Sequence, residues 1–235
     1  MHRRPMLRIL AASAALLFGA TVVTAAGRSG EVTENDRQGV LDIVGAQTEA
    51  NDEIQSHYKV CPAEIANTAR PFWRVLFPGE DISRESCGED IKACYRTCME
   101  EGNAAACLAL GYTLEAASPV ISPLWSQMLF AQACAAGSSG GCTNRAAGIR
   151  NGQLDGDPIL KAEPDELRGC FLRTFALTCN EDDAWGCTML GQAYQFGEGA
   201  LPDVSAAKRF YEKSCAISEN FSACDFARDR LEELE

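Results

Sequence analysis

Cysteines are the residues of this chain whose type and spacing point most clearly to chemistry. Twelve of the 235 residues are cysteine. Thiols at this density act as disulfide partners, metal ligands or redox centres. Eight of them form four pairs with seven or eight residues between the members, and successive pairs start 36, 45 and 36 residues apart. Because the number is even and the spacing regular, we predict a disulfide framework. The predicted pairs are Cys98–Cys107, Cys134–Cys142, Cys179–Cys187 and Cys215–Cys224.

Two alternative uses of the thiols have weaker support. Redox catalysis would favour a Cys-x-x-Cys pair, and the chain contains none. A zinc site of cysteine and histidine is disfavoured because His57 is the only histidine after the first few residues. Cys94 and Cys98 are four residues apart, so on a helix they would share a face as soft metal ligands. A thiol or metal-binding protein therefore remains the second alternative, although we assign no metal ligand or cofactor.

The four other cysteines fall outside the regular pairs. They are Cys61, Cys87, Cys94 and Cys170, and four cysteines allow three connectivities. A helical hairpin that turns at Pro78-Gly79 would bring Cys61 near Cys94, which favours that pair. Cys87 and Cys170 have no assigned partner.

The elements that position these cysteines repeat along the chain. A period of about 35 residues is typical of arrays in which each unit is a pair of helices. The segment 186–191 (GCTMLG) matches 106–111 (ACLALG), and 141–146 is a degenerate copy. An aromatic residue precedes three of the paired cysteines by four residues, which is one helical turn. Gly111 and Gly191 would let the two helices of a unit approach closely. Gly197 and Gly199 predict a tight turn with positive φ.

The clearest unit, residues 183–218, resembles the Sel1-like repeat, and its paired cysteines are similar to those of the Helicobacter cysteine-rich protein branch of that family. The resemblance implies an all-α fold, an α/α solenoid of disulfide-stapled helix pairs. We divide it into units at about 103–138, 139–182 and 183–219, with a capping helix at 220–235. The inner face of such a solenoid binds a protein or peptide. Exposed residues of the first helices would line it, and our candidates are Arg145, Gln192 and Gln195.

The resemblance also implies an enzymatic alternative, because some relatives have been described as penicillin-binding or weakly β-lactam-hydrolysing. Two Ser-x-x-Lys matches occur, Ser56 to Lys59 and Ser205 to Lys208. In serine β-lactamases this spacing places a lysine beside the nucleophile. The partner motifs Ser-Asp-Asn and Lys-Thr-Gly are both absent. We therefore favour binding over catalysis and assign no catalytic residue.

The N-terminal part has a different character. Residues 1–26 read as an export signal, with a basic head, an apolar stretch and small residues for cleavage. Residues 27–52 are polar and acidic, and we expect a flexible lead-in. Residues 53–102 form a divergent helical part. There the spacing of Ile65, Ala69, Phe72, Trp73 and Leu76 predicts one buried helical face.

Charge limits the range of partners. The formal net charge is −12, and removal of residues 1–26, which hold three arginines and no acid, takes it to −15. Such a chain repels nucleic acid and anionic lipid, and it attracts a basic or neutral partner. We expect a periplasmic or secreted protein with no membrane span after processing, whose partner is a protein or peptide.

Overall fold

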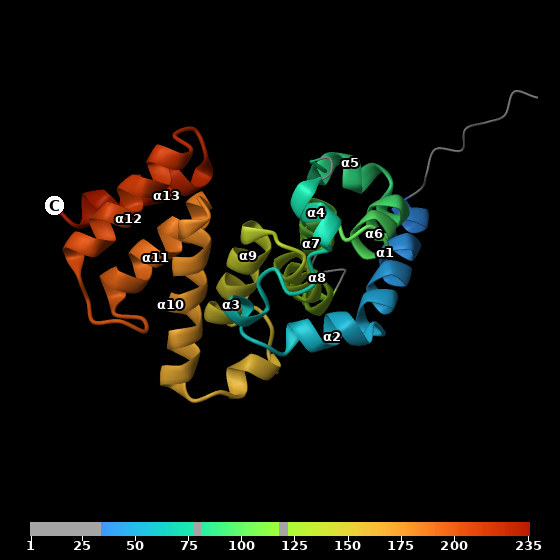
Figure 1. Ribbon diagram of the computed structural model, residues 1–235, viewed down its shortest axis with the longest axis horizontal. Helices are drawn as coiled ribbons and strands as arrows, with labels where there is room; N and C mark the ends of the chain where they lie inside the picture. Colours follow the sequence, from blue (N-terminus) through green and yellow to red (C-terminus); the bar gives the residue numbers. More distant parts are fainter. Residues whose placement is uncertain (1–33, 78–80, 118–121) are drawn as a thin grey trace, which may run out of the picture. The chain divides into compact units, whose positions relative to one another are not determined.

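The computed structural model describes residues 34–77, 81–117 and 122–235, which belong to one compact unit, Thr33–Glu235. The export signal predicted at 1–26 lies outside the described residues. Within these ranges the chain forms α-helices and one 3-10 helix, and no strand; the all-α prediction is confirmed (Figure 1). No helix in these ranges has the length and apolar character needed to cross a membrane. The elements are α1 (Glu34–Glu49), α2 (Asp52–Tyr58), α3 (Pro62–Ile65), α4 (Phe72–Leu76), α5 (Arg84–Glu89), α6 (Ile91–Met99), α7 (Ala104–Ala116), α8 (Pro123–Ala135), α9 (Ser139–Arg150), η1 (Pro158–Lys161), α10 (Pro164–Asn180), α11 (Ala184–Phe196), α12 (Val204–Ile217) and α13 (Ser222–Glu233).

Helices that follow one another in sequence also pack against one another from α6 to α13 (Figure 1). The pairs α7–α8, α9–α10 and α11–α12 fall within the three ranges in which we predicted helix pairs, and α13 covers α11 and α12. The buried apolar residues form successive clusters along this series of helices. Each helix therefore buries its apolar residues against the helices next to it in sequence.

The first helix of each pair starts at a capping residue four positions before a cysteine. Asn103, Ser138 and Asp183 each accept a hydrogen bond from the backbone N–H three residues further on. Such caps satisfy N–H groups that have no partner inside the helix. The cap sets the start of the helix, and the cysteine then lies one turn inside it.

Glycine and an aromatic ring set the distance between the two helices of a pair. A Cβ atom added to Gly111 would lie 2.6 Å from the ring of Phe130, and one added to Gly191 would lie 2.6 Å from the ring of Tyr211. Both rings are fully buried. The close approach predicted at these glycines is therefore present. Gly197 and Gly199 have φ values of 74° and 80°, as predicted for the turn between α11 and α12.

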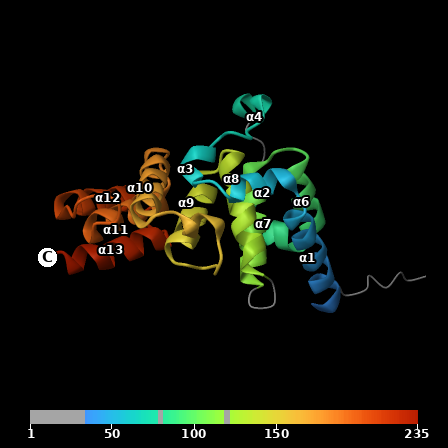
Figure 2. The ribbon, with the colours of Figure 1, turned by 90° about the horizontal axis from the view of Figure 1, so that it is seen from below.

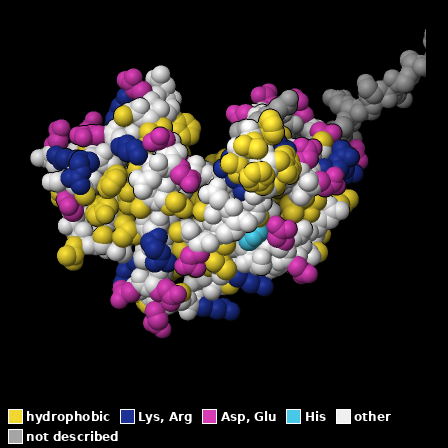
Figure 3. Space-filling model, in the orientation of Figure 1, with side chains coloured by type: hydrophobic (Ala, Val, Ile, Leu, Met, Phe, Trp, Pro, Cys, Tyr) yellow, Lys and Arg dark blue, Asp and Glu magenta, His cyan; other side chains and the backbone are white. Residues whose placement is uncertain are grey.

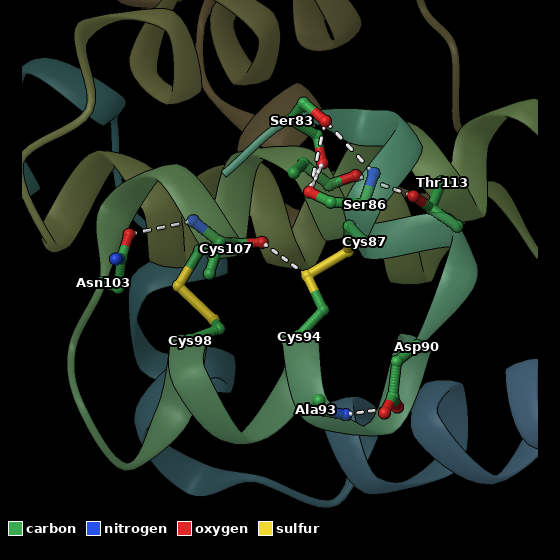
Figure 4. The surroundings of a disulfide bond; sticks show 12 residues. Ser83, Ser86, Cys87, Asp90, Ala93, Cys94, Cys98, Asn103, Cys107 and Thr113 are labelled. Carbon is green, nitrogen blue, oxygen red and sulfur yellow. Dashed lines mark hydrogen bonds between the residues drawn. A yellow bond between two sulfur atoms is a disulfide. The ribbon is translucent and has the colours of Figure 1, made fainter. Parts of the chain in front are cut away.

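All twelve cysteines are in disulfides, and the four predicted pairs are among them. The predicted Cys61–Cys94 pair is wrong. Cys94 bonds Cys87 on α5, whereas Cys61 bonds Cys170 on α10. Cys94 and Cys98 do lie one turn apart on α6, but each is joined to a different neighbouring helix (Figure 4). Within the described residues, no cluster of side chains suited to a metal ion is present.

The N-terminal part departs from the prediction in two places. Residues 34–49 form α1, whose Leu41 and Val44 are buried, where we expected a flexible lead-in. The buried face predicted for 65–76 breaks up into the short helices α3 and α4. Phe72 and Leu76 are 79% and 62% exposed, and α4 protrudes from the helices beside it (Figure 2). Pro71 separates the two helices, because proline opens a helix more readily than it continues one.

Candidate binding groove

A segment between α3 and α4 crosses the turns that join successive helix pairs. The backbone N–H groups of Asn67 and Ala69 donate to the carbonyl oxygens of Cys134 and Ala135, at 3.2 and 2.9 Å. Further along, the ring of Pro71 packs against Gly102, where an added Cβ would lie 2.6 Å from its Cγ. The segment is thus held against two turns of the helix array, and its side chains have defined places.

Arg70 comes from this segment and Arg74 from α4, and both line a cavity of about 450 Å³. The opposite wall consists of the start of α7 and the α8–α9 turn. Gly137 in that turn has φ of +106°, and a Cβ there would lie 2.9 Å from Cδ of Arg70. Two features therefore require glycine at position 137: the positive φ of its backbone, and the aliphatic part of Arg70, which packs where a Cβ would lie.

The charges at this cavity are only partly neutralised within the protein. Arg74 donates to the carboxylate of Glu101 at 3.1 Å and lies over the ring of Trp73, 4.3 Å from its centre. In the described part of the chain, neither Arg70 nor Asp81, the one acid of the cavity, forms an ion pair. The guanidinium of Arg70 donates only to the carbonyl oxygen of Arg74, at 3.4 Å.

A second cavity, also of about 450 Å³, lies further along the helix array. Tyr112, Trp185 and Phe221 line it, together with Asp182 and Asp183. The ring of Phe221 is 45% exposed. This end of the surface is therefore aromatic and acidic.

Asp183 has both a structural role and an unusual environment. Its carboxylate caps α11 by accepting from the N–H of Gly186 at 2.8 Å. Burial raises the pKa of Asp183, and this effect outweighs the hydrogen bonds to its carboxylate, which lower the pKa. Burial also raises the pKa of Tyr112, whose hydroxyl accepts from Asn144 at 2.7 Å.

Leu108, Ser139 and Gly140 line both cavities, so the two cavities adjoin over the first helices, and we call them together the groove. Its basic end lies at Arg70 and Arg74, and its acidic end at Asp182 and Asp183. Side chains of both signs, aromatic rings and backbone N–H groups at helix starts are suited to holding an extended segment of another chain.

Our three sequence-based candidates for the binding face do not line this groove. Arg145 is fully buried and forms an ion pair with Asp157. Gln192 is 7% exposed and accepts from Arg150 at 3.0 Å, and Gln195 accepts from the hydroxyl of Tyr211 at 2.6 Å. The prediction was wrong for Arg145 and Gln192 because it assumed that polar residues of a first helix face water.

The serines of the two Ser-x-x-Lys matches lie on separate helices outside the groove. The hydroxyl of Ser56 on α2 donates to the carbonyl oxygen of Glu53, and Ser205 lies exposed in the first turn of α12. His57 bonds Gln132 at 2.8 Å through Nδ1. None of these contacts joins a serine to a lysine or to a histidine.

Sequence reasoning missed Arg70, Arg74 and the exposed surface of α4. Five large apolar side chains of this short stretch are at least 45% exposed, and they form an apolar surface over α4 (Figure 3). They are Phe72, Trp73, Val75, Leu76 and Phe77. The sequence does contain a signal for this surface, since Pro71 and Pro78 bracket an apolar run too short for a core helix.

Comparison with protein-family models, curated proteins and solved structures found no match to this chain.

Proposed function

We propose that this protein is an exported scaffold, an α/α solenoid of Sel1-like helix pairs stapled by disulfides, which binds a segment of a protein partner. One observation carries the proposal: the groove over α7, α9 and α11, whose two adjoining cavities share Leu108, Ser139 and Gly140. Binding in such a groove requires neither a cofactor nor a catalytic residue.

The disulfides support the proposed location outside the cytosol. Six of them indicate an oxidising environment, since thiols stay reduced in the cytosol of most organisms. A periplasmic or secreted location fits this chemistry and the apolar N-terminal stretch. Local disulfides between successive helix pairs also restrain the groove, which lowers the entropy lost on binding.

Selection from a displayed library of random peptides on the purified, oxidised protein tests the proposal. We expect peptides to be enriched on the wild-type protein and lost on Ser139→Trp, because the new ring fills the groove where its cavities join. Ser205→Trp is the matched control, since it changes a serine in the first turn of α12, outside the groove. The proposal fails if nothing is enriched, or if Ser139→Trp retains the same peptides.

A further inference from the structure

The apolar surface of α4 is the largest departure from ordinary packing in the described part of the chain. Monomeric proteins seldom leave neighbouring large apolar side chains in water, and such patches commonly mark interaction sites. Here the patch is anchored to the turn between α6 and α7. Pro71 packs on Gly102, and Arg74 donates to the backbone and the carboxylate of Glu101, each at 3.1 Å. The exposed rings therefore belong to a fixed surface.

This surface continues directly into the basic cavity through Arg74. The residue belongs to α4, its guanidinium lies over Trp73, and it lines the cavity beside Arg70. Tryptophan, phenylalanine and arginine are the residue types enriched at the energetic centres of protein interfaces. An apolar surface and a pair of cations thus lie side by side.

The charge of the cavity indicates what enters it. Two arginines and one aspartate line this cavity, so its lining carries a formal charge of +1, whereas the chain as a whole carries −12. Arg70 forms no ion pair within the described residues, and an arginine fork matches a carboxylate well. A carboxylate of a partner would complete the pairing that Arg70 lacks, and Asp81 on the rim would oppose it.

We propose that α4 and the basic cavity form one docking site for an acidic and apolar segment of a partner protein. A carboxylate of the segment lies between Arg70 and Arg74, and apolar side chains next to it cover Phe72 and Leu76. The remainder of the segment follows the groove past Ser139. This inference rests on the proposed function and specifies the chemistry of the partner.

A protein segment fits these observations better than a lipid surface does. An anionic membrane would be repelled by the net charge of the chain, whereas a single carboxylate meets the arginines at contact distance. The cavity also continues into a groove, which a chain can follow and a flat membrane cannot.

The test uses the peptide most strongly enriched in the display selection on the wild-type protein, with fluorescein attached. We expect this peptide to contain an aspartate, a glutamate or a free C-terminal carboxylate next to apolar residues. Replacing that carboxylate by its amide should weaken binding about ten-fold, the effect of losing one charge-assisted contact. The change Arg70→Gln should weaken the acidic peptide to the same extent and leave the amide peptide unaffected. Asp81→Asn should tighten binding of the acidic peptide.

Matched variants separate the site from general effects of charge and hydrophobicity. Arg168→Gln with Arg173→Gln removes two exposed arginines of α10, outside the groove, and should change nothing. Phe72→Ser with Leu76→Ser should weaken the peptide, whereas Leu201→Ser, at a side chain 87% exposed, should not.

The outcomes distinguish this inference from the proposed function. If peptides are enriched but lack acidic groups, or bind the arginine variant equally well, the inference is wrong and the proposed function stands. If no peptide is enriched, both fail. Sedimentation with vesicles of phosphatidylcholine and phosphatidylglycerol tests whether the protein binds a lipid surface instead. Vesicle binding that is lost with Phe72→Ser and Leu76→Ser would assign α4 to a lipid surface and overturn the inference.

Discussion

Arg145 and Asp157 form a two-pronged ion pair inside the helix array. Nη1 of Arg145 lies 2.5 Å from Oδ2 of Asp157, and Nη2 lies 2.8 Å from Oδ1. The two side chains are 0% and 2% exposed. Nη2 also donates to the carbonyl oxygen of Tyr58 at 2.9 Å, and the guanidinium lies over the ring of that tyrosine. One buried arginine thus joins α2, α9 and the turn before η1.

Removing one partner of this pair should destabilise the fold strongly. Arg145→Met leaves the Asp157 carboxylate buried without a counter-charge, and the expected loss is about 3–5 kcal/mol of the free energy of unfolding. The double change Arg145→Met and Asp157→Leu should cost less than Arg145→Met alone, since no buried charge then remains. Urea denaturation of the wild type, the single variants Arg145→Met and Asp157→Leu, and the double variant measures these values. A double variant that loses the sum of the two single losses would show that the residues are not coupled.

The long-range disulfide should contribute more stability than a local one. Cys61–Cys170 spans 109 residues, whereas Cys179–Cys187 spans 8. In the chain-entropy model the first is worth about 4–5 kcal/mol and the second about 2.5 kcal/mol. Replacing both cysteines of each pair by alanine, followed by urea denaturation, compares the two. The long bridge also ties α3 to α10, so its loss should make the chain around α3 the first site of proteolysis. Equal losses in the two variants would contradict this ranking.

Replacement of two helix glycines by alanine should change the stability of the protein in opposite directions. Gly191→Ala places a Cβ 2.6 Å from the ring of Tyr211, and overpacking of this kind typically costs about 1–3 kcal/mol. Gly39 in α1 has no atom within 4 Å of an added Cβ, so Gly39→Ala should stabilise the protein by about 0.5–1 kcal/mol through helix propensity. Thermal unfolding followed by circular dichroism gives both signs. A stabilising Gly191→Ala would contradict the packing between α11 and α12.

Asp183 should make stability depend on pH in a defined direction. Its pKa is raised by burial above the ordinary value of 3.8, so the folded state binds this proton more tightly than the unfolded chain. The resulting stabilisation is fully present below 3.8 and is lost as the pH rises through the folded pKa. Asp183→Asn keeps the cap and removes the buried charge, so its stability at neutral pH should equal or exceed that of the wild type.

The control for this prediction is Asp183→Ala, which removes the cap as well and should cost about 1 kcal/mol at neutral pH. Urea denaturation at pH 4 and pH 7 compares the three proteins. The assigned direction is wrong if Asp183→Asn is less stable than the wild type at pH 7 but not at pH 4.

Features set by contacts close in sequence were predictable. The four regular disulfides, the helix pairs and the close helix approach at Gly191 depend on residues within one unit or in two successive units, so the repeat pattern indicated them. The Cys87–Cys94 bridge belongs to the same class. Its cysteines follow the capping residues Ser83 and Asp90 by four positions, the spacing at which the second cysteine follows a cap in three of the regular pairs (Figure 4). That signal was present in the sequence, and we did not use it.

Features set by contacts distant in sequence were not predictable. Nothing near Cys61 indicates Cys170, which is 109 residues away. Helix α1 is held by Trp125, whose ring occupies the space that a side chain at Gly45 would take and whose Nε1 donates to Glu49 at 3.1 Å. A polar, acidic segment gives no local sign of such a partner. The basic cavity depends likewise on a segment that crosses turns formed much later in the chain.

Amide hydrogen exchange with and without the most enriched peptide tests the central claim, that the groove binds a partner segment, most directly. We predict that the peptide slows exchange in residues 102–108 and 136–144, which form the floor of the groove, and in residues 70–77 around α4. Residues 204–214 on α12, which do not line the groove, should exchange at the same rate with and without the peptide. Protection confined to α12 or α13, or no protection in residues 102–108 and 136–144, would contradict the account.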